Sequence, residues 1–296
     1  MPATTPLAPV PSAHRPAPAF RGRIGRDARS GHYAVPHRYR LHLSTACPDG
    51  LRLAVGHSLL GLGTSCPVTP LPAVPDLPDG GYSTLRPLYE ASAHHHTGPA
   101  LGPVLSDDWS GRIVSTHTPD ILRDLDRFPR DGGARLHPRA HTSTVEAVER
   151  LCAEGIEEAA QRAGRAGADP AERDAALDVL LDTLGRLERS LTGEEYLIAG
   201  RLTAADIELW VSLVQLDTVH RHHLDAAAVQ RIAGHPALWT YARRLAAHPA
   251  FGTHLDLDGI ARRHRGRCQG LEAAGAAVQI LDWAHHSEHA PDPSRR

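Results

Sequence analysis

Polar and apolar residues alternate from residue 40 to residue 44, as they do in a half-buried strand. Cys47 and Pro48 follow directly. Pro48 suits the first position of a helix, because proline lacks the N–H that such a position leaves unpaired. The apolar residues that come next have helical spacing, up to the glycines 61 and 63: Leu51, Leu53, Val55, Leu59 and Leu60. The pattern therefore predicts that Cys47 lies where a strand turns into a helix.

The rest of the first half is expected to complete a small sheet. Further strands are expected at three places: residues 68–71, 102–105 and 111–114. Residues 72–100 are rich in Pro, Gly and His and are expected to form an irregular insertion. A helix should then begin with Thr118 as its N-cap and Pro119 as its first residue. This order is a strand–helix–strand unit followed by two strands and a helix.

The second half has helical periodicity almost throughout. Two long amphipathic helices are expected, separated by a break at residues 164–170. Thr203 and Asp206 have the spacing of a capping box with Asp in place of the usual Glu or Gln, and a strongly apolar helix follows them. A further helix should begin near Pro236. We therefore expect an all-helical domain after the sheet domain.

These patterns divide the chain into five parts: a loosely ordered N-terminal extension (1–35), an α/β domain (36–128), a linker (129–140), an all-helical domain (141–265) and a C-terminal tail (266–296). A chain of 296 residues with 41% hydrophobic content is long enough to bury two cores.

Charge and hydropathy narrow the classes of function. The net charge of −2 gives no reason to expect a nucleic-acid partner, and no apolar run has the length of a membrane span. The first twenty residues lack the apolar core of a signal peptide, so a cytoplasmic location is expected. The four cysteines are far apart, without a Cys-x-x-Cys pair, and a disulfide framework is not expected.

Cys47 is the main chemical candidate. The amides and dipole of a helix N-terminus stabilise a thiolate, which is the nucleophilic form of cysteine. Because residue 50 is glycine, Cys47 would act as a monothiol and would need an external thiol to resolve a mixed disulfide. Arg52 either binds a carboxylate or stabilises the thiolate, or is a solvated helix residue. The alternative for Cys47 is a buried, inert thiol.

The histidines are not expected to bind metal. Residues 94–96 and His220, His222 and His223 are close in sequence, but consecutive histidines in a loop rarely converge on one ion. No acidic or cysteine partner is expected at metal-ligand spacing from them, so no bound metal is predicted.

Several segments, in order along the chain, resemble the glutathione transferase superfamily, and within it the glutathionyl-hydroquinone reductases of the omega-like Xi class. They are Phe20-Arg21-Gly22-Arg23-Ile24, residues 38–48 up to Ala46-Cys47-Pro48, Gly111-Arg112-Ile113-Val114, Arg201-Leu202-Thr203-Ala204-Ala205-Asp206-Ile207, Leu216-Asp217 and Pro236-Ala237-Leu238-Trp239. The resemblance covers roughly residues 20–265. It implies an α/β thioredoxin-like N-terminal domain joined to an all-α C-terminal domain, and commonly a homodimer.

The resemblance also implies site residues. Pro103, after Gly102, matches the cis-proline beside the catalytic cysteine. His117-Thr118 stand where the family has Glu-Ser to hold the γ-glutamyl end of glutathione. After Cys-Pro, the family's Trp-Ala-His-Arg is replaced by residues 49–52, Asp-Gly-Leu-Arg. Two substrate-side tyrosines align with Glu157 and His220, and His220 is the expected proton donor.

Together these features predict a thiol-dependent transferase or reductase that acts through a mixed disulfide on thiol-conjugated quinol-like or other electrophilic small molecules. The cosubstrate is glutathione or another low-molecular-weight thiol such as mycothiol. Mycothiol is included because the basic residues are all Arg and Asn is absent, a composition typical of GC-rich, actinobacterium-like coding. The alternative is a non-catalytic binding protein on the same fold.

Overall fold

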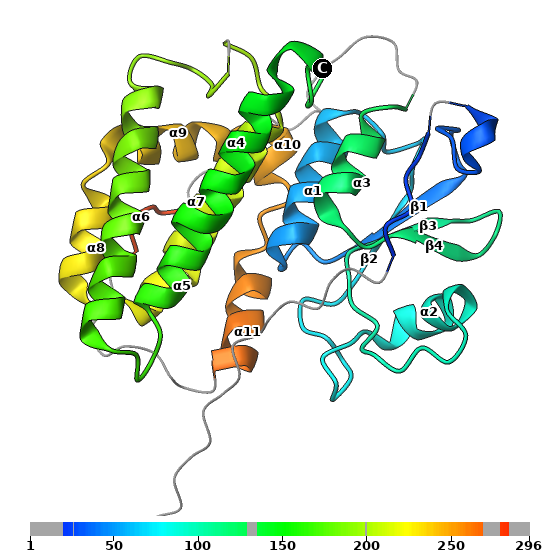
Figure 1. Ribbon diagram of the computed structural model, residues 1–296, viewed down its shortest axis with the longest axis horizontal. Helices are drawn as coiled ribbons and strands as arrows, with labels where there is room; N and C mark the ends of the chain where they lie inside the picture. The colour runs from blue at the N-terminus through cyan, green and yellow to red at the C-terminus, as the bar shows by residue number, and fades with distance from the viewer. Residues whose placement is uncertain (1–19, 26, 129–134, 199, 269–278, 284–296) are drawn as a thin grey trace, which may run out of the picture.

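The computed structural model describes residues 20–25, 27–128, 135–198, 200–268 and 279–283, and shows a sheet-containing half and a helical half side by side (Figure 1). The sheet has four strands in the order β2-β1-β3-β4. They are β1 (Tyr39–Leu43), β2 (Val68–Pro70), β3 (Val104–Asp107) and β4 (Arg112–Ser115). β1 is parallel to β2 and antiparallel to β3, and β3 is antiparallel to β4. The predicted strands and their order along the chain are confirmed.

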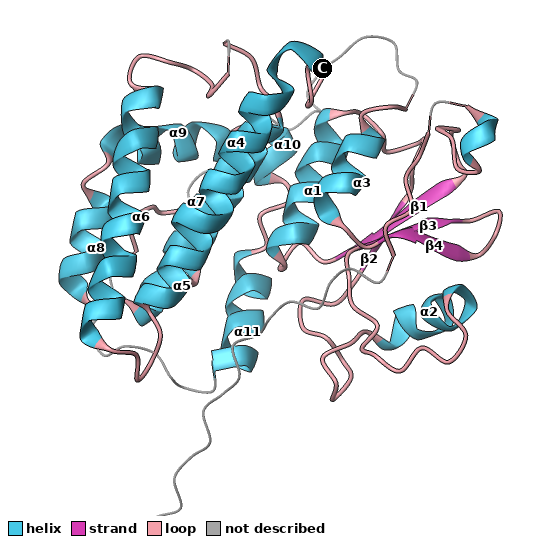
Figure 2. Ribbon diagram, viewed as in Figure 1, coloured by secondary structure: helices cyan, strands magenta, loops and turns pink. Residues whose placement is uncertain are grey.

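Three helices cover this sheet. α1 (Pro48–Leu59) and α3 (Thr118–Leu125) lie on one face and α2 (Arg86–Ser92) on the other (Figures 1 and 2). Pro48 is the first residue of α1, as predicted. Two expectations are wrong: residues 72–100 contain α2, whose Tyr89 is buried, and Thr118 does not cap α3. The N-cap is His117 instead, so the sequence placed the cap one residue too late.

Residues 20–25 are packed against α3, so the predicted loose extension is wrong for this part. Ile24 is fully buried, and its N–H donates to the Asp124 carboxylate at 2.6 Å. Arg23 binds the same carboxylate at 2.8 Å and Asp120 at 3.0 Å. Residues 1–19 of the predicted extension, and 129–134 of the predicted linker, lie outside the described residues. Leu136, within the linker, is fully buried.

The helical half is built around one buried helix, α7 (Ala204–Thr218). The other elements are α4 (Thr142–Cys152), a π-helical turn (Ala153–Glu158), α5 (Ala159–Ala163), α6 (Pro170–Leu191), a 3-10 turn (His220–His223), α8 (Ala226–Ala233), α9 (Pro236–Ala246), α10 (Pro249–Gly252) and α11 (Leu257–Cys268). The all-helical second domain is confirmed. Among the described residues, every helix is too short or too polar to span a lipid bilayer.

The start of α7 is fixed by the capping box predicted from the sequence. The Thr203 N–H donates to the Asp206 carboxylate at 2.8 Å, and the reciprocal bond from the helix is also present. The Tyr241 hydroxyl donates to the other Asp206 oxygen at 2.9 Å. Burial raises the pKa of Asp206 in spite of these hydrogen bonds. The cap therefore fixes α7 against α9 as well as starting it.

α11 lies between the two halves of the molecule (Figure 1). On it, Arg263 donates to the carbonyl oxygen of Ala73 at 3.0 Å and to the Tyr82 hydroxyl at 2.9 Å, both in the sheet domain. The predicted end of the helical domain at residue 265 falls inside this helix. Farther on, residues 280–283 are held to the buried Asp217, so this part of the predicted tail belongs to the helical domain. Residues 269–278 and 284–296 lie outside the described residues.

Candidate active site

Three predicted site segments meet at the end of the sheet where β1 and β4 finish, which we call the thiol-bearing edge. Cys47 is the N-cap of α1, four residues after β1 ends; it is half-buried, and its N–H donates to the Ser44 carbonyl oxygen at 3.1 Å. The β1–β3 register pairs His42 with Val104, which places Pro103 opposite the end of β1. β4 runs parallel to β1, so α3 begins at this edge too. Two helix N-termini and Pro103 therefore share the edge that carries the thiol.

The peptide bond between Gly102 and Pro103 is cis, as the sequence predicts. Gly102 is half-buried, and a Cβ there would lie 2.6 Å from a methyl carbon of Leu71. Only a residue without a side chain fits this approach unless Leu71 moves. At the start of α1, a Cβ on Gly50 would clash with the Ser44 carbonyl group. Glycine at these two positions allows the loops around Cys47 to pack closely.

Thr118 is buried, and its hydroxyl oxygen has no hydrogen-bond partner among the described residues. A buried hydroxyl without a partner costs stability unless a ligand or water satisfies it. Since Thr118 does not cap α3, its hydroxyl can bond a ligand. Its predicted contact with the thiol cosubstrate stays a prediction.

His117 belongs to a small ionic cluster at the start of α3. Its Nδ1 lies 2.8 Å from the Asp120 carboxylate and 3.0 Å from an Arg21 nitrogen, and Arg21 binds the same carboxylate at 2.7 Å. Burial favours the protonated form of Asp120, but hydrogen bonds from Arg21 and His117 and the charge of Arg23 outweigh it and lower the pKa of that carboxyl. His117 thus has internal partners, and its contact with a thiol ligand stays a prediction.

Arg52 is buried and turned toward the helical domain. It binds Glu208 of α7 at 2.6 Å, Glu157 of the π-helical turn, and Asp49 one turn earlier at 3.7 Å. These carboxylates raise the pKa of Arg52 against the effect of burial, so the guanidinium is always charged. Its place excludes the solvated alternative, and a ligand carboxylate would have to compete with three internal ones.

Glu208 is the residue that sequence reasoning missed here. Burial raises the pKa of Glu208 to about 7, against the opposing effect of Arg52 and with the added effect of Glu157. One guanidinium faces three carboxylates, and the cluster holds a proton more readily than any isolated carboxylate would. The available signal was an acidic residue between the apolar residues Ile207 and Leu209, inside a helix expected to be strongly apolar.

His220 is half-buried at the first position of the 3-10 turn after α7. Burial lowers the pKa of His220 to about 4, although the Glu157 carboxylate opposes the shift. Near neutral pH the imidazole is therefore uncharged. The role of proton donor predicted for His220 is weakened, because a neutral imidazole is a much poorer acid than imidazolium.

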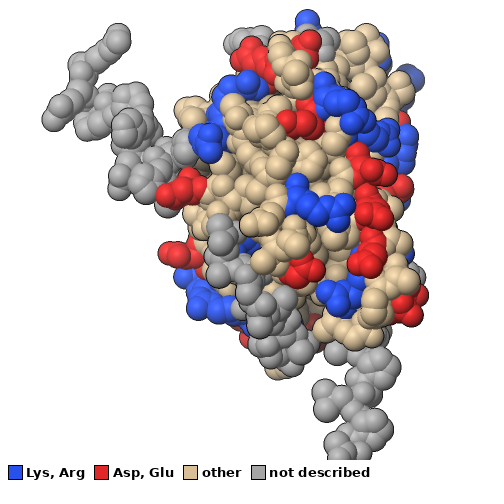
Figure 3. Space-filling view, turned by 90° about the vertical axis from the view of Figure 1, so that its left-hand side faces the viewer, with Lys and Arg blue, Asp and Glu red and all other residues tan. Residues whose placement is uncertain are grey.

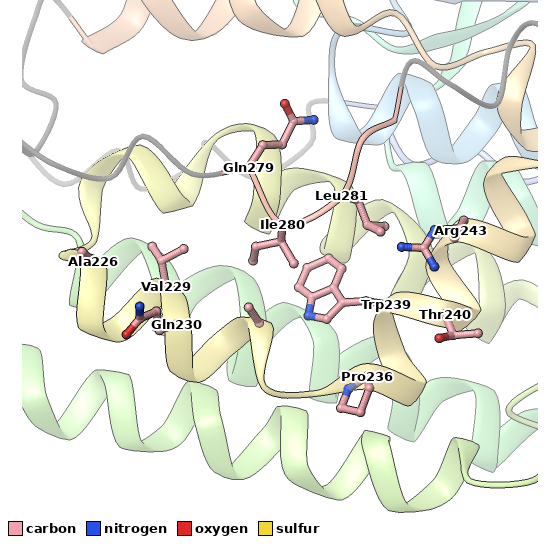
Figure 4. A pocket seen from close by; sticks show the side chains of 11 residues that line it. Ala226, Val229, Gln230, Pro236, Trp239, Thr240, Arg243, Gln279, Ile280 and Leu281 are labelled. Atoms are coloured by element: carbon pink, nitrogen blue, oxygen red, sulfur yellow. The ribbon is translucent and has the colours of Figure 1, made fainter.

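A pocket of about 470 Å³ opens elsewhere, between α8, α9 and residues 279–281 (Figure 4). Trp239 forms its floor and Arg243 its charged edge, and none of the predicted site residues lines it. Figure 3 shows the left-hand side of Figure 1, where uncharged residues cover much of the face between basic and acidic side chains. The thiol-bearing edge and this pocket are thus separate features of the fold.

Comparisons with known proteins agree with this architecture. A family model described as the glutathione S-transferase C-terminal domain matches residues 170–244. Glutathionyl-hydroquinone reductase PcpF from Sphingobium chlorophenolicum is 31% identical over 245 residues, which cover 77% of this chain and 76% of PcpF. The chain belongs to the Xi class of glutathione transferases, the family of the glutathionyl-hydroquinone reductases. The family and fold predicted from the sequence are therefore confirmed.

Other Xi-class proteins extend the similarity over more of the chain. Glutathionyl-hydroquinone reductase YqjG from Escherichia coli is 28% identical over 293 residues, covering 91% of this chain and 88% of YqjG. A solved structure of YqjG with glutathione bound has a TM-score of 0.73 at 23% identity, covers 89% of this chain and 94% of that one, and shows the shared fold. The Xi-class transferase from Natrialba magadii has a TM-score of 0.77 at 25% identity, with 91% of each chain covered.

Proposed function

We propose that this Xi-class protein is a thiol-dependent reductase whose nucleophile is Cys47. The observation that carries the proposal is the placement of a half-buried thiol at the N-terminus of α1, on the same sheet edge as cis-Pro103. A helix N-terminus stabilises the thiolate, and the free backbone beside a cis-proline suits a peptide-like thiol ligand. The relatives named as glutathionyl-hydroquinone reductases support the reaction class.

In the proposed reaction, the Cys47 thiolate attacks the sulfur of a thiol-conjugated quinol. An S–S bond forms and the carbon–sulfur bond breaks, so the electron pair of that bond passes to the aromatic carbon, which takes a proton from water. A second molecule of thiol, as thiolate, then attacks the mixed disulfide and releases the thiolate of Cys47. The quinol is reduced by two electrons, and two thiols leave as one disulfide.

We propose a low-molecular-weight thiol as cosubstrate and leave glutathione and mycothiol as the two candidates. Asp49 stands where the family's tryptophan covers bound glutathione, and His117 where its glutamate pairs with the glutathione ammonium group. Asp49 and Glu157 instead belong to the Arg52 cluster. These changes favour a thiol without the γ-glutamyl end. The homodimer and the cytoplasmic location also stay predictions.

Intact-mass spectrometry tests the first half-reaction. The purified protein is incubated with glutathione disulfide or with mycothiol disulfide, and peptide mapping locates the adduct. We expect one thiol adduct on Cys47 that the matching free thiol removes, and no such adduct on the Cys47→Ser variant. Release of quinol from a glutathionyl- or mycothiyl-hydroquinone tests the complete reaction.

The two disulfides separate the alternatives. Preference for mycothiol, with slow reaction of glutathione, identifies the cosubstrate. If neither disulfide modifies Cys47 while iodoacetamide does, the thiol is accessible but has no thiol-binding site, and the non-catalytic alternative holds.

A further inference from the structure

One cluster of metal-ligating side chains lies outside the Cys47 site. His223 ends the 3-10 turn after α7, and His264 and Cys268 lie one turn apart on α11. One potential ligand atom from each of the three lies within 4.8 Å of the other two. The expectation of no metal missed this set, although His264 and Cys268 are four residues apart on a helix, a spacing that puts both on one face.

We propose that these three side chains form a zinc site that joins α11 to the end of α7. The Cys268 sulfur lies 3.2 Å from Nδ1 of His264 and 3.4 Å from Nε2 of His223. In a tetrahedral zinc site, with Zn–S about 2.3 Å and Zn–N about 2.0 Å, nitrogen and sulfur ligands lie about 3.5 Å apart. The two sulfur–nitrogen distances are thus close to those of a tetrahedral zinc site, and all three donor atoms lie within 4.8 Å of one another.

The chemistry of the donors selects the metal class. One thiolate and two imidazoles suit zinc, whereas magnesium and calcium prefer oxygen ligands. Three protein ligands leave a fourth position for water or a ligand donor. The ring of His222 stacks on that of His264 at 5.4 Å between centroids, with 26° between the planes, and this packing limits rotation of the ligand ring. Copper shares the preference for such donors and is the competing metal.

The proposed zinc site would connect α11, which contacts the sheet domain, to the helical domain. α11 contacts the sheet domain through Arg263, which binds Ala73 and the Tyr82 hydroxyl. A metal bound by His223, His264 and Cys268 would fix the C-terminal half of this helix, which also carries Arg263, to the end of α7. Hydrogen bonds between the Cys268 thiol and the two imidazoles are the alternative account of the same distances, and they need no metal.

Cobalt(II) distinguishes the two accounts, because it replaces zinc in tetrahedral sites and its spectrum reports bound thiolate. Metal-free protein, kept reduced, is titrated with cobalt and then with zinc. We expect a thiolate-to-cobalt charge-transfer band with visible bands of tetrahedral cobalt, saturating at one ion per chain and abolished by an equivalent of zinc. Elemental analysis of the protein as purified separates zinc from copper, because copper binds such donors more tightly in any titration; copper in place of zinc would overturn the assignment to zinc.

Matched variants assign the ligands. Cys268→Ser should abolish the charge-transfer band and weaken zinc binding by more than the roughly 10- to 100-fold that loss of an outer-shell partner costs. Cys47→Ser should leave the band unchanged, since its thiol lies at the other site. A triple change of residues 94–96 to Ala removes the loop histidines and should also leave it unchanged. A wild-type protein without the band, or a band that survives in Cys268→Ser, overturns the zinc site.

Discussion

Replacing Glu208 by glutamine should remove a pH-dependent loss of stability from the interface between the domains. The Glu208 carboxyl receives a hydrogen bond from Nε of Arg52 at 2.6 Å, and its side chain is only 16% exposed. Glu157 and Asp49 face the same guanidinium. Glutamine has the shape of the protonated carboxyl and keeps an oxygen that can accept the Arg52 hydrogen bond.

The size of the effect follows from the pKa of Glu208, which burial raises from 4.5 to about 7. A folded-state pKa above the unfolded one means that the folded protein holds the proton more tightly. The resulting stability is complete below pH 4.5 and is lost as the pH rises through 7. By proton linkage, the group takes away about 2 kcal/mol of unfolding free energy between about pH 5.5 and 8.

Urea unfolding of the wild type and Glu208→Gln at the two pH values measures this term. The variant should be more stable than the wild type by about 1 kcal/mol at the lower pH and by about 3 kcal/mol at the higher one, so that the difference widens by about 2 kcal/mol. Burial lowers the pKa of His220 to about 4, so below pH 6.5 this group makes the unfolding free energy of both proteins rise with pH. This contribution is the same in the wild type and the variant and cancels in the difference between their unfolding free energies. Glu90→Gln, on the exposed face of α2, should have the wild-type profile. A variant less stable than the wild type at high pH would show that ionised Glu208 stabilises the fold, and would refute the reasoning.

Two further outcomes are expected. Asp217→Ala should lower the unfolding free energy, measured in urea, by about 3 to 5 kcal/mol, because the carboxylate accepts three hydrogen bonds from the C-terminal segment. Asp217→Asn should lower the unfolding free energy by less, and equal losses in the two variants would contradict this account. Iodoacetamide should modify Cys47 and Cys268 in the native protein and spare Cys66 and Cys152, since burial raises the pKa of Cys66 to about 12 and that of Cys152 well above its ordinary value. Peptide mapping of the alkylated cysteines checks this pattern, and saturating zinc should protect Cys268, and not Cys47, from iodoacetamide.

Local features of the fold could be predicted from the sequence because each depends on residues close together in the chain. The alternation before Cys47 gave β1, and Pro48 marked the start of α1. Thr203 and Asp206, three residues apart, were enough to place the start of α7. The exact cap of α3 was missed, because Thr118 and His117 are adjacent and the hydroxyl made threonine the better candidate. The helix α2 was missed as well, within a segment rich in Pro, Gly and His.

The environment of the site could not be predicted in the same way, because its partners are far apart in sequence. Arg52 meets Glu208 across 156 positions. Arg21 and Arg23 lie in the predicted loosely ordered extension, yet each binds a carboxylate of α3 about a hundred residues away. No periodicity connects such pairs, and only the folded backbone brings them together.

Two positions at which this chain differs from its family, Asp49 and Glu157, both contact Arg52, the arginine that the chain shares with the family's Trp-Ala-His-Arg motif. The resemblance aligns Asp49 with the tryptophan that covers glutathione and Glu157 with a substrate-side tyrosine, and both positions now carry carboxylates that face Arg52. Random loss of a binding site would not be expected to replace two distant aromatic residues with acids that share one arginine. Charged groups in a buried cluster are costly unless they are paired, so both acids depend on Arg52. Their shared partner favours a site rebuilt for a different ligand over one that has decayed, with Cys47 retained at its edge.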